Sequence, residues 1–146
     1  MLLNRKSLGG LAIVFLAGVA AGRLLPPGAV AHAQGDRRVF ELRTYTAPEG
    51  RLPELQARFR NHTMRIFNKH NMTSIAYWVP QDAPNSQNTL IYVLAHPSRE
   101  AAKKNWADFQ ADPEWQKVSA ESQVNGRIVS KVESVFMDPT DYSPIK

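Results

Sequence analysis

The sequence predicts an α+β fold, a ferredoxin-like βαββαβ domain with a four-stranded antiparallel sheet and helices on one face. The first observation behind this prediction is the order of hydrophobic periods, which alternates between the two-residue period of a strand and the longer period of a helix. The second is that residues 90–95 are apolar on both faces, so the sheet must be covered on both sides. Because the helices cover only one side, we expect two copies to pair through the other side as a homodimer with a barrel-like centre.

The first half of the domain reads as strand, helix, strand. Residues 37–46 alternate as a strand does, and Pro48-Glu49-Gly50 ends that strand. From Leu52 the apolar period becomes helical, and we expect this helix to end near His70. Its apolar face consists of Leu55, Phe59, Ile66 and Phe67.

A hairpin and a second helical region come next. Residues 73–79 and 90–96 are rich in strand formers, and the short, proline-containing loop between them favours an antiparallel hairpin. Ser98 is a helix cap, and Asp112-Pro113-Glu114 is a second helix start. Gly126 ends the helical part, and residues 127–137 alternate as the fourth strand. The proline-rich tail, residues 138–144, is expected to pack on the fold or on the partner subunit.

Residues 1–33 read as a signal peptide, which leaves residues 34–146 as one domain. Arg5 and Lys6 precede an apolar run over residues 8–21, and Ala31-His32-Ala33 offers a cleavage site before Gln34. We therefore expect export to the periplasm or the exterior of a bacterial cell. An uncleaved segment would leave the protein tethered to the membrane, and we expect no other contact with a membrane.

Composition limits the classes of function. The chain has 18 basic and 13 acidic side chains, but Arg5, Lys6 and Arg23 belong to the signal segment. The domain itself is therefore only slightly basic, and we expect no nucleic-acid partner. There is no cysteine, which excludes disulfides, thiolate metal sites and a cysteine nucleophile. The sequence also contains no nucleophile elbow, phosphate loop or dinucleotide fingerprint.

Several short segments follow one another in a fixed order along the domain. They are 40–46 (Phe-Glu-Leu-Arg-Thr-Tyr-Thr), 61–63, 67–70, 77–78, 88–92 (Asn-Thr-Leu-Ile-Tyr), 98–102, 112–115 (Asp-Pro-Glu-Trp) and 139–144. In this order they resemble the NIPSNAP family, a branch of the dimeric α+β-barrel superfamily. This resemblance implies the fold and the homodimer expected above. The wider superfamily includes cofactor-independent monooxygenases and haem-degrading enzymes, which implies a pocket between sheet and helices. The roles of eukaryotic members in mitochondria do not suit an exported chain.

His62 is the candidate catalytic residue. At helical spacing it lies close to the apolar face of the first helix, so it could reach a cleft beside the sheet and act as a general base or hydrogen-bond a ligand. The alternative is a structural histidine. His70 could cap its own helix, and His96 reads as a turn residue at a strand end.

Large rings with polar groups are the candidate ligand-binding residues. They line apolar pockets, dimer interfaces and protein cores equally well, and all three alternatives stay open. The first helix also carries a basic flank, which is either a solvated surface or a site for an anionic ligand or phospholipid. The candidate rings are Tyr45, Tyr77, Trp78, Tyr92 and Trp106, and the flank is Arg58, Arg60, Arg65 and Lys69.

We expect no metal site and no cofactor, since the histidines have no metal-ligand spacing; a histidine-ligated haem is the one cofactor left open. The sequence thus predicts an exported homodimeric module that binds a small apolar or aromatic molecule. The alternative is a cofactor-independent oxygenase or isomerase with His62 as general base.

Overall fold

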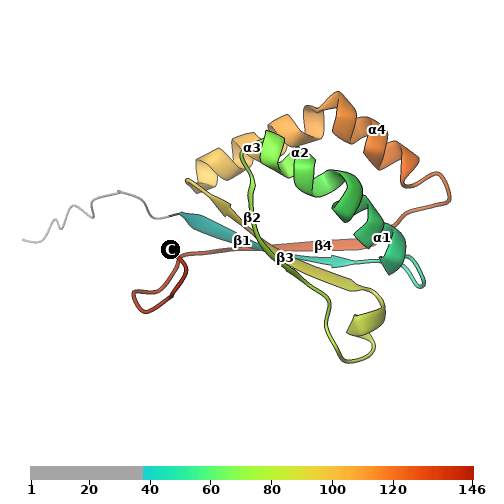
Figure 1. Cartoon of the computed structure of the whole chain (residues 1–146), viewed down its shortest axis with the longest axis horizontal. Helices are drawn as coiled ribbons and strands as arrows, with labels where there is room; N and C mark the ends of the chain where they lie inside the picture. Colours follow the sequence, from blue (N-terminus) through green and yellow to red (C-terminus); the bar gives the residue numbers. More distant parts are fainter. Residues whose placement is uncertain (1–37) are drawn as a thin grey trace, which may run out of the picture. The chain divides into compact units, whose positions relative to one another are not determined.

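The computed structural model describes residues 38–146, and the predicted signal peptide lies outside the described residues. The predicted order of strands and helices and the antiparallel sheet are confirmed, and the α-helices lie on one side of the sheet (Figure 1). The elements are β1 (Val39–Thr46), α1 (Leu52–Arg58), the π-helix η1 (Phe59–Thr63), α2 (Met64–Lys69), β2 (Thr73–Trp78), the 3₁₀-helix η2 (Asn85–Gln87), β3 (Thr89–His96), α3 (Arg99–Ala111), α4 (Pro113–Glu121) and β4 (Lys131–Met137).

The sheet has the strand order β2-β3-β1-β4, with every neighbouring pair antiparallel. The predicted hairpin of β2 and β3 is therefore present. The fourth strand begins at Lys131 rather than at Arg127. The reason is that Ile128, fully buried, leaves the strand path to fill the core, and pairing with β1 starts only beyond Ser130.

The first helical region contains a turn of π-helix that the sequence did not reveal. Met64 donates its backbone N–H to the carbonyl of Phe59, five residues back, and the Thr63 hydroxyl donates to the Arg58 carbonyl at 3.3 Å. One extra residue in this turn rotates the next helical turn relative to a regular helix. The buried positions are consequently Leu55, Phe59, Thr63 and Ile66, and His62 is turned toward solvent.

α3 and α4 begin at the two predicted caps. The Ser98 hydroxyl accepts from the Ala101 backbone N–H at 3.0 Å, and the Asp112 carboxylate accepts from that of Glu114 at 2.8 Å. The other carboxylate oxygen of Asp112 lies 2.6 Å from both the Lys69 ammonium and the His70 imidazole. His70 thus joins the end of α2 to the start of α4 rather than capping its own helix.

The side of the sheet that faces the helices carries charged residues, which was not expected from the sequence. On β1 the charged Glu41 and Arg43 point toward the helices, whereas Phe40 and Leu42 point away from them. We call the outer surface the helix-free face. It carries the apolar side chains of all four strands: Ala76 and Trp78 of β2, Ile91 and Val93 of β3, Phe40 and Leu42 of β1, and Val135 and Met137 of β4.

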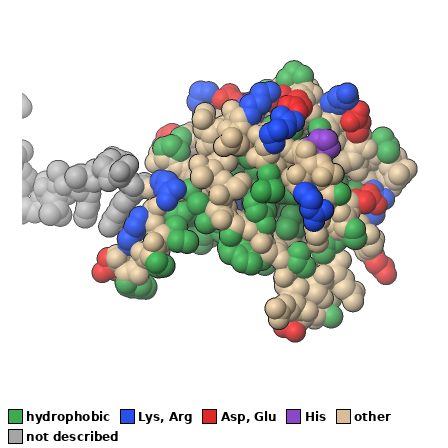
Figure 2. All heavy atoms as spheres, viewed as in Figure 1, with side chains coloured by type: hydrophobic (Ala, Val, Ile, Leu, Met, Phe, Trp, Pro, Cys, Tyr) green, Lys and Arg blue, Asp and Glu red, His purple; other side chains and the backbone are tan. Residues whose placement is uncertain are grey.

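The helix-free face is the more apolar surface of the domain. Trp78 is 51% exposed and Val135 55% exposed. Figure 2 shows charged side chains gathered over the helices and hydrophobic ones gathered over the strands below them. Part of the C-terminal tail, including Pro139 and Ile145, lies beside this face and lines a groove with Trp78. Within residues 38–146 no helix is long and apolar enough to cross a membrane.

Replacing Asp112 with alanine is expected to lower the Tm by about 5 °C, because α4 loses its N-cap and the link to α2. Asp112→Asn is the matched control, since asparagine keeps a capping oxygen and should lose less. Thermal unfolding followed by circular dichroism makes the comparison. An equal loss in both variants would mean that the contacts of the charged carboxylate with Lys69 and His70, and not the cap, stabilise this corner.

Candidate functional site

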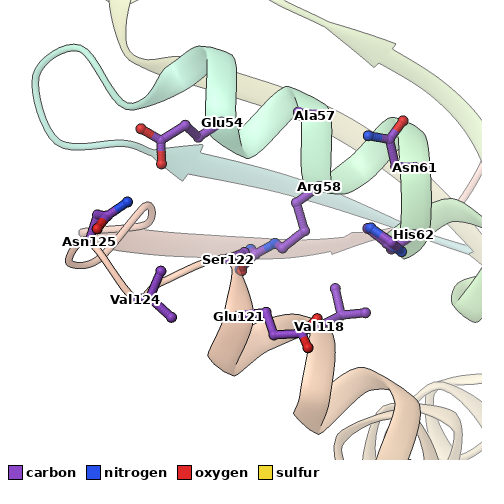
Figure 3. A pocket seen from close by; sticks show the side chains of 10 residues that line it. All are labelled: Glu54, Ala57, Arg58, Asn61, His62, Val118, Glu121, Ser122, Val124 and Asn125. Carbon is purple, nitrogen blue, oxygen red and sulfur yellow. The ribbon is translucent and has the colours of Figure 1, made fainter.

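A groove runs between the first helical region and α4, and we call it the α1–α4 groove. It encloses about 340 Å³ and brings together side chains from α1, η1, the end of α4 and the loop after it (Figure 3). Its lining consists of Glu54, Ala57, Arg58, Asn61, His62, Val118, Glu121, Ser122, Val124 and Asn125. The groove thus collects polar side chains around an apolar floor.

Arg58 is the buried charge of this groove. It is 6% exposed, so the interpretation of this residue as part of a solvated flank is wrong. Its guanidinium reaches from α1 toward Ser122 (Figure 3) and donates to that hydroxyl at 3.3 Å. It also lies over the Trp115 ring, 5.1 Å from the centroid, while its Nε–H has no hydrogen-bond partner in the described part of the chain. Burial lowers the pKa of Arg58, and the guanidinium forms no salt bridge with any residue from 38 to 146.

His62 borders the same groove but not the sheet. Its side chain is exposed, because the π-turn places Thr63 rather than His62 on the buried face. Within residues 38–146 the ring has no hydrogen-bonding partner that would orient it as a general base. From this position the His62 ring can hydrogen-bond a molecule bound beside Arg58.

A second polar group is buried between α3 and the sheet, and we call it the Glu41 cluster: Glu41, Arg43, His96, Trp106 and Ser134. Glu41 is 1% exposed. One carboxylate oxygen accepts from Arg43 at 2.6 Å and from the Ser134 hydroxyl at 2.7 Å. The other accepts from the Trp106 indole at 2.7 Å and lies 3.2 Å from His96 Nε2.

Burial alone would raise the pKa of Glu41. The hydrogen bonds from His96, Ser134 and Trp106, together with the charge of Arg43, outweigh burial and lower its pKa to about 2. His96 is fully buried, so its interpretation as a turn residue is wrong. A signal for this placement existed in the sequence, since His96 shares strand parity with Leu90, Tyr92 and Leu94 and must face the same side.

Beside the Glu41 cluster, α3 and β4 enclose a second groove of about 580 Å³, which we call the α3–β4 groove. Arg43 stacks over the Trp106 ring at 4.1 Å, and Arg99 stacks over the Phe136 ring at 4.6 Å. The groove therefore has one aromatic side chain from the helix and one from the strand. Its lining consists of Glu41, Arg43, Arg99, Glu100, Lys103, Trp106, Ser134 and Phe136.

The five candidate ring residues fall into three places. Tyr45 and Tyr77 both contact the fully buried Tyr92, with ring centroids 5.3 and 5.5 Å from it, inside the aromatic core. Trp78 lies on the helix-free face, and Trp106 lines the α3–β4 groove. Within residues 38–146 no three histidine, aspartate or glutamate side chains converge as metal ligands would.

The arrangement of this sheet and its helices can be compared with known proteins. The sequence profile of the NIPSNAP family matches residues 40–144. The chain belongs to the NIPSNAP family. A search of curated protein sequences finds no match.

Solved structures show the same fold. A NIPSNAP family protein of unknown function from Agrobacterium tumefaciens is 21% identical over 75% of this chain and 95% of its own, with a TM-score of 0.65. An uncharacterised NIPSNAP-like domain protein from Burkholderia xenovorans is 18% identical over 74% and 90%, with a TM-score of 0.64. SnoaB, a cofactor-independent oxygenase from Streptomyces nogalater, is 13% identical over 75% and 99%, with a TM-score of 0.50.

Glu41→Gln is expected to destabilise the NIPSNAP domain by ~3 kcal/mol at pH 7, because an amide cannot accept all the hydrogen bonds made to the buried carboxylate. The folded pKa of Glu41 lies below its ordinary value, so the stabilisation is present above about pH 4.5 and is lost as the pH falls toward 2. Urea unfolding of both proteins between pH 7 and pH 2.5 should therefore show their stabilities converging. A constant difference across this range would contradict the assignment.

Proposed function

We propose that this NIPSNAP protein is an exported homodimer that binds a small apolar or aromatic molecule in the α3–β4 groove. The single observation that supports this site best is the pair of rings, Trp106 and Phe136, that border the groove on opposite elements. Rings that border a groove favour a flat apolar or aromatic ligand, which here would also contact Arg43 and Arg99, since each arginine covers a face of one ring. The Glu41 cluster holds Trp106 in place through its indole N–H, so this wall is preorganised.

The aromatic core is a less suitable site for such a ligand. Tyr92 is fully buried, and its ring contacts those of Tyr45, Phe59, Phe67 and Tyr77. A ligand entering there would have to displace packed rings. We therefore assign ligand binding to Trp106 and the groove, and a packing role to Tyr45, Tyr77 and Tyr92.

The homodimer is supported by the helix-free face. Exposed Trp78, Val135 and Met137 lie on one surface with the half-buried Leu42 and Val93, and a continuous apolar surface on a soluble domain is typical of an interface. Pairing this face with its copy would bury both and complete the cover that β3 requires. Trp78 would then be an interface residue.

Export is supported by the sequence of residues 1–33, which has a basic start, an apolar run and a small-residue cleavage site. A catalytic alternative with His62 as general base has less support. A base needs a partner that orients its ring, and no such partner of His62 is present in the part of the chain that the structure describes.

Phe136→Ala is expected to weaken binding of an aromatic compound about tenfold, because the groove loses one of its two ring walls. Val132→Ala is the matched control, since Val132 lies on the same strand and outside the groove. A thermal-shift screen of aromatic and lipid-like compounds on residues 34–146, followed by titration of the best compound, measures both. The proposal fails if no compound raises the Tm of the wild type.

Val135→Arg is expected to convert the homodimer into a monomer, because each copy would bring a cation into an apolar interface. Val132→Arg is the control, since Val132 is 45% exposed and its side chain points to the opposite side of β4. Multi-angle light scattering at micromolar concentration reports the mass of each. A monomeric wild type would refute the dimer directly.

A further inference from the structure

We propose that the α1–α4 groove is a second binding site, distinct from the α3–β4 groove, and that Arg58 in it binds the carboxylate of a small organic acid. The starting observation is an arginine that is only 6% exposed and whose guanidinium makes one hydrogen bond within residues 38–146, at 3.3 Å, to a neutral hydroxyl. A buried charge without a counter-ion is costly for a folded protein. A bound anion would balance the charge of Arg58.

The acidic side chains at the rim do not supply that anion. Glu54 pairs with Arg51 at 2.7 Å, and Glu121 lies 3.8 Å from Lys117. Each rim carboxylate therefore has its own cation outside the groove. Among residues 38–146 neither Glu54 nor Glu121 forms a salt bridge with Arg58. The charge of Arg58 is therefore the unbalanced charge of the groove.

The guanidinium of Arg58 is only partly satisfied. Trp115 covers a face of the guanidinium, and Ser122 takes one hydrogen bond from Nη1. The buried Nε–H has no hydrogen-bond partner among residues 38–146. A carboxylate matches the planar edge of a guanidinium with two parallel hydrogen bonds. His62 and Asn61 line the same groove, and the His62 ring points to the side of Arg58, where it can donate to the ligand (Figure 3).

The rest of the lining favours an organic acid over phosphate. Ala57 and Val118 provide an apolar floor for a hydrocarbon body. One guanidinium balances one negative charge, so a dianion would leave a second negative charge unbalanced in the groove. The ligand class is therefore a monocarboxylate with a short apolar body.

The test uses the mature chain, residues 34–146, which contains every described element of the fold. Sodium hexanoate is titrated at constant ionic strength, with hexanol as the neutral isostere and inorganic phosphate as the dianion. We expect hexanoate to raise the Tm, by about 5 °C at twentyfold excess over its Kd, and to shift the Arg58 Nε–H resonance saturably in nitrogen-correlated NMR spectra. Hexanol should do neither.

Arg58→Met separates a ligand site from a structural arginine. We expect it to weaken hexanoate binding about tenfold or more and to leave the Tm without ligand unchanged or higher, because an unbalanced buried charge has been removed. Arg58→Lys, which keeps the charge and loses the planar edge, should bind with intermediate affinity. Arg60→Met, an exposed change two residues away, and Phe136→Ala, in the other groove, should bind as the wild type does.

Three results would overturn the assignment. They are no saturable shift of the Arg58 Nε–H resonance by hexanoate in the wild type, unchanged hexanoate binding in Arg58→Met, and phosphate binding at least as tight as hexanoate binding. The first is measured on the wild type alone, so it decides even if a variant does not fold. Failure of the aromatic screen in the α3–β4 groove would leave these outcomes unaffected, since Phe136 lies outside the α1–α4 groove.

Discussion

The need to cover both faces of β3 shapes most of this domain. Leu90, Tyr92 and Leu94 point to the helices and are nearly inaccessible, while Ile91 and Val93 point the other way. Burying one face against helices fixes which side the helical layer takes. The opposite face then remains apolar without a helix above it, and this imbalance is the basis of the proposed face-to-face assembly of two sheets.

Two charged side chains buried on the helical side of the sheet differ in the number of partners that balance their charge. Glu41 receives several donors, including the charged Arg43, and its carboxylate is held ionised in the interior. Arg58 has similar burial, yet receives one neutral partner. A satisfied buried charge stabilises a particular arrangement of its neighbours, whereas an unsatisfied one raises the energy of the free protein. The same kind of burial thus indicates a structural role in one case and a binding role in the other.

Much of this fold can be predicted from local rules in the sequence. The alternation of β1 and β4, the caps at Ser98 and Asp112, and the apolar residues of α1 all predict the elements that form. The exposed position of His62 has a physical origin. Regular helical spacing from Leu55 and Phe59 leads to position 62, but the π-turn adds one residue and moves the buried position to Thr63. No local pattern in the sequence predicts the π-helical turn.

Burial of Arg58 and His96 depends on tertiary packing, which a single sequence encodes only indirectly. Arg58 is buried because α4 and Trp115 pack over it, and those residues are distant in the chain. His96 could have been placed by strand parity, but its partner Glu41 lies 55 positions earlier. Pairing across such a separation becomes visible only when β1 and β3 are placed side by side.

The α1–α4 groove owes its shape to contacts at its two ends. At one end, Asp112 joins the start of α4 to His70 and Lys69 at the end of α2. At the other, the Arg51 guanidinium donates to the carbonyls of Asn125 and Gly126, at 2.8 and 3.1 Å. These contacts fix the spacing of the two helical segments before any ligand arrives. The Arg58 side chain, held in a groove of fixed width, has already lost most of its conformational entropy in the free protein. A carboxylate that binds there would therefore avoid much of the entropy cost of ordering a flexible surface arginine.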